Sequence, residues 1–173
     1  MTSSSDFRNI TTLIFDIDGT LTDGRIAYEA AGNIIKFFHM RDMHWMKLAL
    51  RAGLNVGILS GRRDAANDRM IADLHLTFAY QDVKDKLAGF EQLLAENNLC
   101  AGECLYLGDD VVDMPVIRRA GIGVAVADAA EELDSAAQFR TRAAGGCGAA
   151  AEVIRMVLKE KDLYDKIMER YRR

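Results

Sequence analysis

Short apolar runs alternate with longer segments of helical periodicity, and this alternation constrains the fold more than any other feature of the chain. The runs predict buried strands over residues 11–15, 55–59, 77–80, 105–107 and 122–126. The segments between and after them predict helices over residues 42–51, 64–74, 83–97, 113–120 and 149–171. Strands that are apolar along their length are typical of a parallel sheet covered on both faces. We therefore predict an α/β fold with a doubly wound, Rossmann-like parallel sheet.

One domain over residues 1–173 is expected, because the chain is long enough for a full core and shows no linker. Within it, residues 25–38 hold two β-rich stretches around Glu29-Ala30-Ala31-Gly32-Asn33. The Gly-Asn pair favours a turn at this point, so we predict a β-hairpin. Asp42 is expected to cap the helix that follows, and one long helix over about 149–171 is expected to end the fold.

The composition indicates an ordinary globular protein. Half of the residues are hydrophobic, and no apolar stretch is long enough to span a bilayer. The first ten residues are polar and expected to fray, and they show no signal-peptide pattern. Cys100, Cys104 and Cys147 are expected to be reduced thiols of a cytoplasmic protein. The slight acidity argues against a nucleic-acid partner.

Aspartates gather where two of the predicted strands end. They are Asp16 and Asp18 after the first strand, and Asp109, Asp110 and Asp113 after the fourth. Without them the formal charge of −4 would become +1, so they account for the acidity of the chain. A carboxylate is costly to bury unless it is paired or bound to a metal. Clustered oxygen ligands with no local His or Cys predict a hard cation, and Mg²⁺ is the usual one.

The spacing of these residues suggests phosphate chemistry. One acid of Asp16-Ile17-Asp18 could attack phosphorus as a nucleophile while the other serves as general acid and then base. Ser60-Gly61-Arg62 follows another strand, and its hydroxyl and backbone amides could bind phosphate oxygens. Lys86 could balance the charge of the phosphate and the nucleophile.

Together these motifs resemble the haloacid dehalogenase superfamily of Mg²⁺-dependent aspartyl-phosphate phosphatases. Its four signatures occur in order as Asp16-x-Asp18-Gly19-Thr20, Ser60, Lys86 and Gly108-Asp109-Asp110-x-x-Asp113. More narrowly, residues 11–158 resemble the capless 3-deoxy-D-manno-octulosonate 8-phosphate phosphatases. The shared features include the hairpin, Arg41-Asp42 and Gly145-Gly146-Cys147-Gly148.

The resemblance implies a role for each matching residue. Asp16 would be the nucleophile and Asp18 the general acid/base, with Ser60 and Lys86 holding the phosphoryl group. Mg²⁺ would be bound by Asp16, Asp18 (through its carbonyl) and Asp109, with Asp110 and Asp113 in support. The candidates for substrate binding are Thr20, Arg41, Gly61 and Arg62. No long insertion separates these motifs, so no large cap domain is expected.

The resemblance also implies an assembly. Subunits of this subgroup form tetramers in which hairpins pack together and one subunit helps to close its neighbour's site. We accordingly expect a homotetramer in which residues 145–148 lie near an active site. The expected substrate is the octulosonate 8-phosphate used in lipopolysaccharide biosynthesis. The alternatives are a nonulosonate 9-phosphate of the sialic-acid type, and a non-catalytic binding protein on the same fold.

Three departures from the subgroup stand out. It usually has a glycine after Arg-Asp, whereas this chain continues Met43-His44-Trp45, in a region that the resemblance places near the substrate. It usually has a basic residue at the position of Cys147. Finally, residues 159–173 add a highly charged segment.

Overall fold

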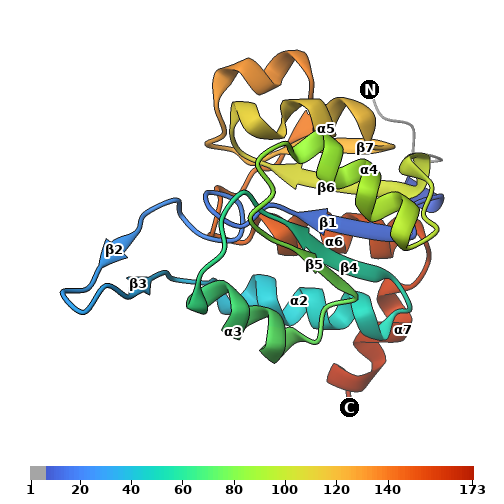
Figure 1. The fold of residues 1–173 in the computed structure, drawn as a ribbon. Helices are drawn as coiled ribbons and strands as arrows, with labels where there is room; N and C mark the ends of the chain where they lie inside the picture. Colours follow the sequence, from blue (N-terminus) through green and yellow to red (C-terminus); the bar gives the residue numbers. More distant parts are fainter. Residues whose placement is uncertain (1–6) are drawn as a thin grey trace.

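The computed structural model describes residues 7–173 as a parallel sheet between two layers of helices, with a hairpin projecting to one side (Figure 1). The strands are β1 (Thr12–Phe15), β2 (Ala27–Tyr28), β3 (Ile34–Ile35), β4 (Asn55–Leu59), β5 (Phe78–Tyr80), β6 (Cys104–Gly108), β7 (Ile122–Ala125) and β8 (Phe139–Arg140). The helices are α2 (Met40–Arg51), α3 (Ala65–Leu74), α4 (Lys86–Glu96), α5 (Met114–Arg119), α6 (Ala149–Glu160) and α7 (Tyr164–Met168). Short 3₁₀ turns occupy Ala101–Glu103, Val111–Asp113, Glu131–Ser135 and Glu169–Tyr171. The first six residues, part of the segment expected to fray and to lack a signal peptide, lie outside the described residues.

The main sheet has the strand order β5-β4-β1-β6-β7-β8, and every neighbouring pair is parallel. The central strand β1 pairs with β4 on one side and β6 on the other. The chain thus winds outward from β1 in both directions, which confirms the predicted doubly wound α/β fold. In such sheets ligands bind beyond the carboxyl ends of the strands, near the point where the winding reverses. Here those ends carry the aspartates.

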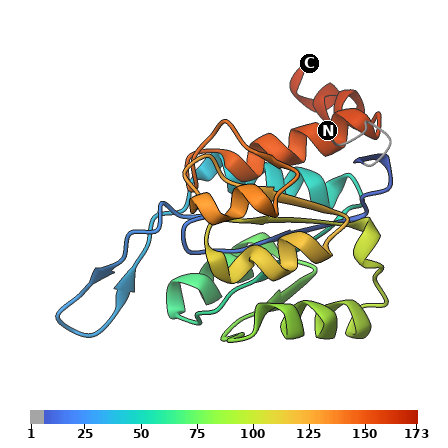
Figure 2. The same ribbon diagram turned by 90° about the horizontal axis from the view of Figure 1, so that it is seen from above.

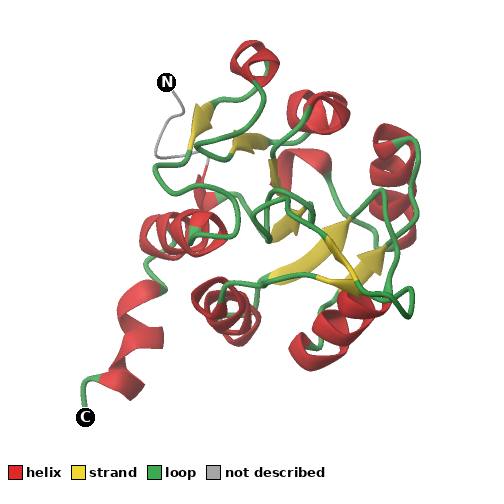
Figure 3. Ribbon diagram, turned by 90° about the vertical axis from the view of Figure 1, so that its left-hand side faces the viewer, coloured by secondary structure: helices red, strands yellow, loops and turns green. Residues whose placement is uncertain are grey.

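Successive side chains of β1 point to opposite faces of the sheet, and this alternation divides the core in two. Leu13 and Phe15 belong to the cluster that packs under α2, α3 and α6, whereas Ile14 belongs to the cluster under α4 and α5. Figures 2 and 3 show helices on both faces of the sheet. Phe7 and Ile10 are buried in the first cluster, so the expected fraying does not extend to them.

The hairpin is confirmed: β2 and β3 pair antiparallel and project away from the main sheet (Figures 1 and 2). Its turn closes by hydrogen bonds from the Gly32 amide to the Glu29 carbonyl and from the Glu29 amide to the Asn33 carbonyl. Gly32 has φ +89°, which a glycine adopts without strain. No large cap domain is present in the described part of the chain.

The single long C-terminal helix was a wrong prediction. Helix α6 ends at Glu160, and the chain resumes as α7 only at Tyr164. Asp162 between them has φ +58°, and the Leu163 amide donates to the Leu158 carbonyl, so the chain turns there and Tyr164 of α7 stacks on Trp45 of α2. The apolar side chains of α7 then pack against the core. None of the described helices meets the length and hydropathy needed to cross a membrane.

The prediction that Asp42 caps its own helix was also wrong. Helix α2 begins at Met40, with His39 at the N-cap position and no side-chain capping bond. The Asp42 carboxylate, only 1% exposed, instead accepts hydrogen bonds from the amides of Gly148 (3.0 Å) and Ala151 (2.7 Å). Gly148 stands at the N-cap of α6 and has no side chain to offer. Asp42 therefore caps α6 from across the core.

Candidate active site

The first aspartate loop is held tightly where β1 ends. The Asp16 amide still donates to Leu107 of the neighbouring strand, at 3.0 Å. The chain then turns sharply, because the Ile17 carbonyl accepts from the amides of Thr20, Leu21 and Thr22. Gly19 stands inside this turn with φ +96°, and a Cβ there would lie 2.0 Å from the Asp109 carboxylate. Only glycine lets the loop approach the second aspartate strand so closely.

Three carboxylates meet at this point. Asp16, Asp109 and Asp113 each place an oxygen within 4.8 Å of the others. Burial and the charge of Asp113 raise the pKa of Asp16 well above its usual value, although Lys86 opposes the rise. The same causes raise the pKa of Asp109 to about 6. These carboxylates repel one another, and a divalent cation among them would relieve that repulsion.

The hydrogen bonds of Asp113 distinguish it from Asp16 and Asp109. One oxygen of Asp113 accepts from Lys86 Nζ and the Tyr106 hydroxyl, both at 2.5 Å. The other accepts from the amides of Asp109 (3.0 Å) and Asp110 (3.2 Å). Both oxygens of Asp113 are thus used in hydrogen bonds within the protein, whereas Asp16 and Asp109 line the cavity described below. An all-oxygen pair of this kind fits Mg²⁺.

Lys86 provides a buried positive charge beside Asp16. It is the first residue of α4, just after the N-cap Asp85, and its ammonium lies 2.7 Å from Asp16 Oδ1 and 2.5 Å from Asp113 Oδ1. Burial opposes its charge, but the two carboxylates outweigh it and raise the pKa of Lys86. Lys86 thus stays charged and can balance negative charge that enters the site.

Opposite the aspartates, the chain after β4 forms a loop suited to phosphate. The Ser60 amide donates to the Tyr80 carbonyl and its own carbonyl accepts from Val83, which fixes the loop between two segments. The Ser60 hydroxyl accepts from the Arg62 amide at 3.3 Å. A cavity of about 490 Å³ lies between this loop and the aspartates. Its lining residues are Asp16, Asp18, Ser60, Gly61, Arg62, Arg63, Asp82, Lys84, Lys86, Asp109, Asp110 and Val112.

Most of the predicted site residues meet at this cavity, but two substrate-binding candidates do not. Thr20 is fully buried, and its hydroxyl donates to Asp109 Oδ1 at 2.9 Å. Arg41 is exposed on α2, outside the cavity wall that residues 7–173 form. His44 and Trp45 also lie elsewhere. Trp45 stacks on Tyr164 at 5.9 Å between ring centroids.

The segment 145–148 lies against the first aspartate loop of its own chain. The Gly146 amide donates to the Thr20 carbonyl, and the Gly145 amide donates to Asp128. A Cβ on Gly145 would lie 1.7 Å from the Gly19 carbonyl oxygen. The glycines therefore allow this segment to brace the loop that carries Asp18, while Cys147 remains exposed.

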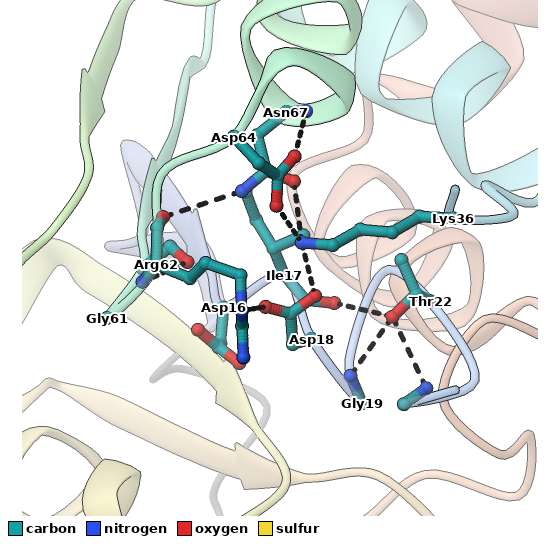
Figure 4. Close-up of polar contacts among 12 residues, drawn as sticks. Asp16, Ile17, Asp18, Gly19, Thr22, Lys36, Gly61, Arg62, Asp64 and Asn67 are labelled. Atoms are coloured by element: carbon teal, nitrogen blue, oxygen red, sulfur yellow. Dashed lines mark hydrogen bonds and ion pairs between the residues drawn. The ribbon is translucent and has the colours of Figure 1, made fainter. Parts of the chain in front are cut away.

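Sequence reasoning missed three residues of the site. Tyr106 lies within β6, where its hydroxyl supports Asp113; burial and nearby acidic charge raise its pKa, so it remains a donor. Lys36 forms ion pairs with both Asp18 and Asp64 and so lies between them (Figure 4). Lys36 interrupts the apolar run 34–38, and this was the one available signal, because a lysine in such a run needs a buried partner.

Comparison with known proteins places this geometry in context. A family profile of haloacid dehalogenase-like hydrolases matches residues 79–154. The chain is 37% identical over 158 residues to the 3-deoxy-D-manno-octulosonate 8-phosphate phosphatase KdsC of Escherichia coli K12, covering 91% of this chain and 84% of that one. The corresponding protein of Yersinia pestis is 36% identical over 154 residues, covering 89% and 82%.

Solved structures of 3-deoxy-D-manno-octulosonate 8-phosphate phosphatases are also similar to this chain. A Moraxella catarrhalis phosphatase of the same name, in complex with magnesium ion, phosphate ion and KDO, superposes with a TM-score of 0.94 at 28% identity and covers 97% of both chains. A cobalt-bound form of the Haemophilus influenzae phosphatase gives a TM-score of 0.88 at 34% identity, with 92% of this chain and 93% of that chain covered.

Proposed function

The chain belongs to the 3-deoxy-D-manno-octulosonate 8-phosphate phosphatases of the haloacid dehalogenase-like hydrolases, and from this premise we propose that it releases inorganic phosphate from that sugar-acid phosphate. It is thus an enzyme, a phosphoric monoester hydrolase. The observation that carries the proposal is the contact of Asp16 with Lys86 beside Asp109, at the end of the central strand. A binding protein without turnover would have no need for this arrangement.

Asp16 and Asp109 would hold Mg²⁺, together with the backbone carbonyl of Asp18. When bound, the cation lowers the charge of the site and so lets an anionic nucleophile approach a phosphate dianion. Lys86 contributes in the same direction from the protein side. Asp113 and Thr20 position these groups through the hydrogen bonds described above.

The reaction then proceeds in two steps. A carboxylate oxygen of Asp16 attacks phosphorus, the bond from phosphorus to the sugar oxygen breaks, and Asp18 gives its proton to the departing alkoxide. Asp18 next takes a proton from water as the water oxygen attacks phosphorus. The bond between Asp16 and phosphorus breaks, and phosphate leaves. The Ser60 hydroxyl, which accepts from the Arg62 amide, would donate to the phosphoryl oxygens together with the Gly61 amide through both steps.

Phosphate release with Mg²⁺ tests the substrate. We expect the highest kcat/KM with octulosonate 8-phosphate, less with a nonulosonate 9-phosphate, and least with glucose 6-phosphate, which lacks the carboxylate. The Asp16→Asn variant controls for contaminating phosphatases. A preference for glucose 6-phosphate would contradict the assigned substrate class.

We further propose that the protein is a homotetramer whose hairpins meet. The hairpin and the residues after it expose large apolar side chains: Tyr28 (74%), Ile35 (46%), Phe37 (73%) and Met40 (75%). A projecting ribbon with this much apolar surface would be covered in an assembly, and closed symmetry would repeat the contact. Light scattering should give a tetramer mass that falls in Tyr28→Glu and persists in the control Tyr171→Ser. A monomer mass with full activity would reject the assembly. The cytoplasmic location stays a prediction.

A further inference from the structure

Lys36 is a buried cation at the base of the hairpin. It follows β3, and its side chain is fully buried, whereas its neighbours Ile35 and Phe37 are 46% and 73% exposed. Alternate side chains of this segment point to opposite sides, so Ile35 and Phe37 face outward while Lys36 points into the protein. Burying an ammonium is costly unless it is fully paired. Its partners therefore indicate what it is for.

Three oxygen atoms surround the Lys36 ammonium (Figure 4). They are Asp18 Oδ1 at 2.6 Å, Asp64 Oδ2 at 2.7 Å and Asn67 Oδ1 at 3.1 Å. The contacts with Asp18 and Asp64 are ion pairs, and the contact with Asn67 is a hydrogen bond donated by the ammonium. The long side chain is thus held at its charged end.

Two of these partners are themselves fixed to the start of α3. Asp64 is the N-cap of α3 and accepts from the Asn67 amide at 2.9 Å. The Asn67 side-chain amide donates to the Arg62 carbonyl at 3.4 Å. Burial acts against the charge of Asp64, yet bonds from Lys36 and the Asn67 amide hold its pKa below the usual value. Asp64 and Asn67 therefore anchor Lys36, and Asp18 is the partner it orients.

Asp18 needs such orientation. It lies in the turn after β1 with a quarter of its side chain exposed, and Arg62 Nε approaches its other oxygen at 3.3 Å. Lys36 and Arg62, from different segments, thus each form an ion pair with a different oxygen of Asp18. Arg62 is 43% exposed and belongs to the loop that faces the phosphoryl group, whereas Lys36 is buried and anchored.

We propose that Lys36 is a positioning residue for the general acid/base Asp18, holding its carboxyl group where it can give a proton to the sugar oxygen as that oxygen leaves and then take a proton from the attacking water. The inference rests on the proposed function, since Asp18 has this role only in the two-step phosphatase reaction. The hairpin would then have a second role besides assembly, because the segment that follows β3 carries Lys36, which orients Asp18.

The leaving group provides the test. An alkoxide needs the proton from Asp18, whereas p-nitrophenolate leaves without it, and kcat/KM reports the steps up to leaving-group departure. In Lys36→Met we expect kcat/KM for octulosonate 8-phosphate to fall by about 10²-fold and that for p-nitrophenyl phosphate by less than about 5-fold, given the usual contribution of a general acid. Asp18→Asn should show the same split. The control Lys47→Met removes a lysine of α2 outside the site and should change neither value.

An equal loss on both substrates would overturn the proposal, because it would mean that Lys36 only supports the fold. So would an unchanged kcat/KM for the sugar phosphate. If Lys36→Met does not fold, the double variant Lys36→Met, Asp64→Asn removes the buried charge left behind, and the same split is expected there. The substrate assignment is tested separately with the wild type. If the wild type does not hydrolyse octulosonate 8-phosphate, the losses of kcat/KM in Lys36→Met are compared between p-nitrophenyl phosphate and an alkyl phosphate that the wild type does hydrolyse.

Discussion

Replacing Asp42 should destabilise the protein far more than replacing an ordinary helix cap. In Asp42→Ala the amides of Gly148 and Ala151 lose their acceptor while they remain buried. Each buried donor left unpaired costs about 1–3 kcal/mol. Part of this is offset, because burial also penalises the carboxylate and raises the pKa of Asp42. We expect a net loss of about 2–4 kcal/mol in the free energy of unfolding, or roughly 10 °C in Tm for a chain of this size.

Urea unfolding at one fixed protein concentration measures the loss, since assembly makes stability depend on concentration. The matched control is Asp85→Ala. Asp85 is exposed at the N-cap of α4 and accepts a single bond, from the Ala88 amide at 3.0 Å, so its loss should cost about 1 kcal/mol. Asp42→Asn keeps one acceptor oxygen, so its loss in the free energy of unfolding should lie between those of Asp42→Ala and Asp85→Ala. If Asp42→Ala costs no more than Asp85→Ala, the reasoning that Asp42 caps α6 across the core is refuted.

Four further outcomes are expected at the active site. Asp16→Asn should abolish phosphate release yet keep Tm within a few degrees, because burial already disfavours the Asp16 charge; near wild-type turnover would reject it as nucleophile. EDTA should stop turnover, Mg²⁺ should restore it, and Ca²⁺ should support it poorly because its coordination shell is larger and looser. With the pKa of Asp109 at about 6 in the folded state and near 3.9 when unfolded, the metal-free protein should lose stability as pH rises through that range. The rise in Tm on adding Mg²⁺, followed by thermal shift, should therefore be larger at pH 7.5 than at pH 5, and an equal rise would contradict the shared carboxylate site. Gly19→Ala should lower both Tm and activity, since its Cβ would lie 2.0 Å from Asp109 Oδ2; an unchanged Tm would show that the loop can move away.

The sheet and the aspartates could be predicted because both are encoded locally. Continuous apolar runs predicted five of the six strands of the main sheet to within a few residues, and parallel strands bring their carboxyl ends to one edge. Strand β8 was missed because it is only two residues long, Phe139–Arg140, and has no apolar run of its own. It forms by pairing with β7 at the edge of the sheet.

Contacts between distant segments could not be predicted. Lys36 and Asn67 are 31 residues apart, and Asp42 and Ala151 are 109 apart, so no local pattern connects either pair. The end of α6 was missed for a related reason. The residue that takes the left-handed conformation there is Asp162, not a glycine, and the turn is stabilised by the packing of α7 on the core.

That packing also explains two departures from the subgroup at once. Trp45 stacks on Tyr164 with an interplanar angle of 11°, and the Arg155 guanidinium lies 5.3 Å above the Trp45 ring. His44 meets Tyr171 edge-on at 5.9 Å. The aromatic pair on α2 and the additional C-terminal residues therefore form one contact, on the side of α2 that receives α7. Because this contact is outside the cavity, the unusual residues after Asp42 need not alter the choice of sugar. Differences in specificity should be sought instead among Arg63, Asp82 and Lys84, which line the cavity beyond the shared motifs.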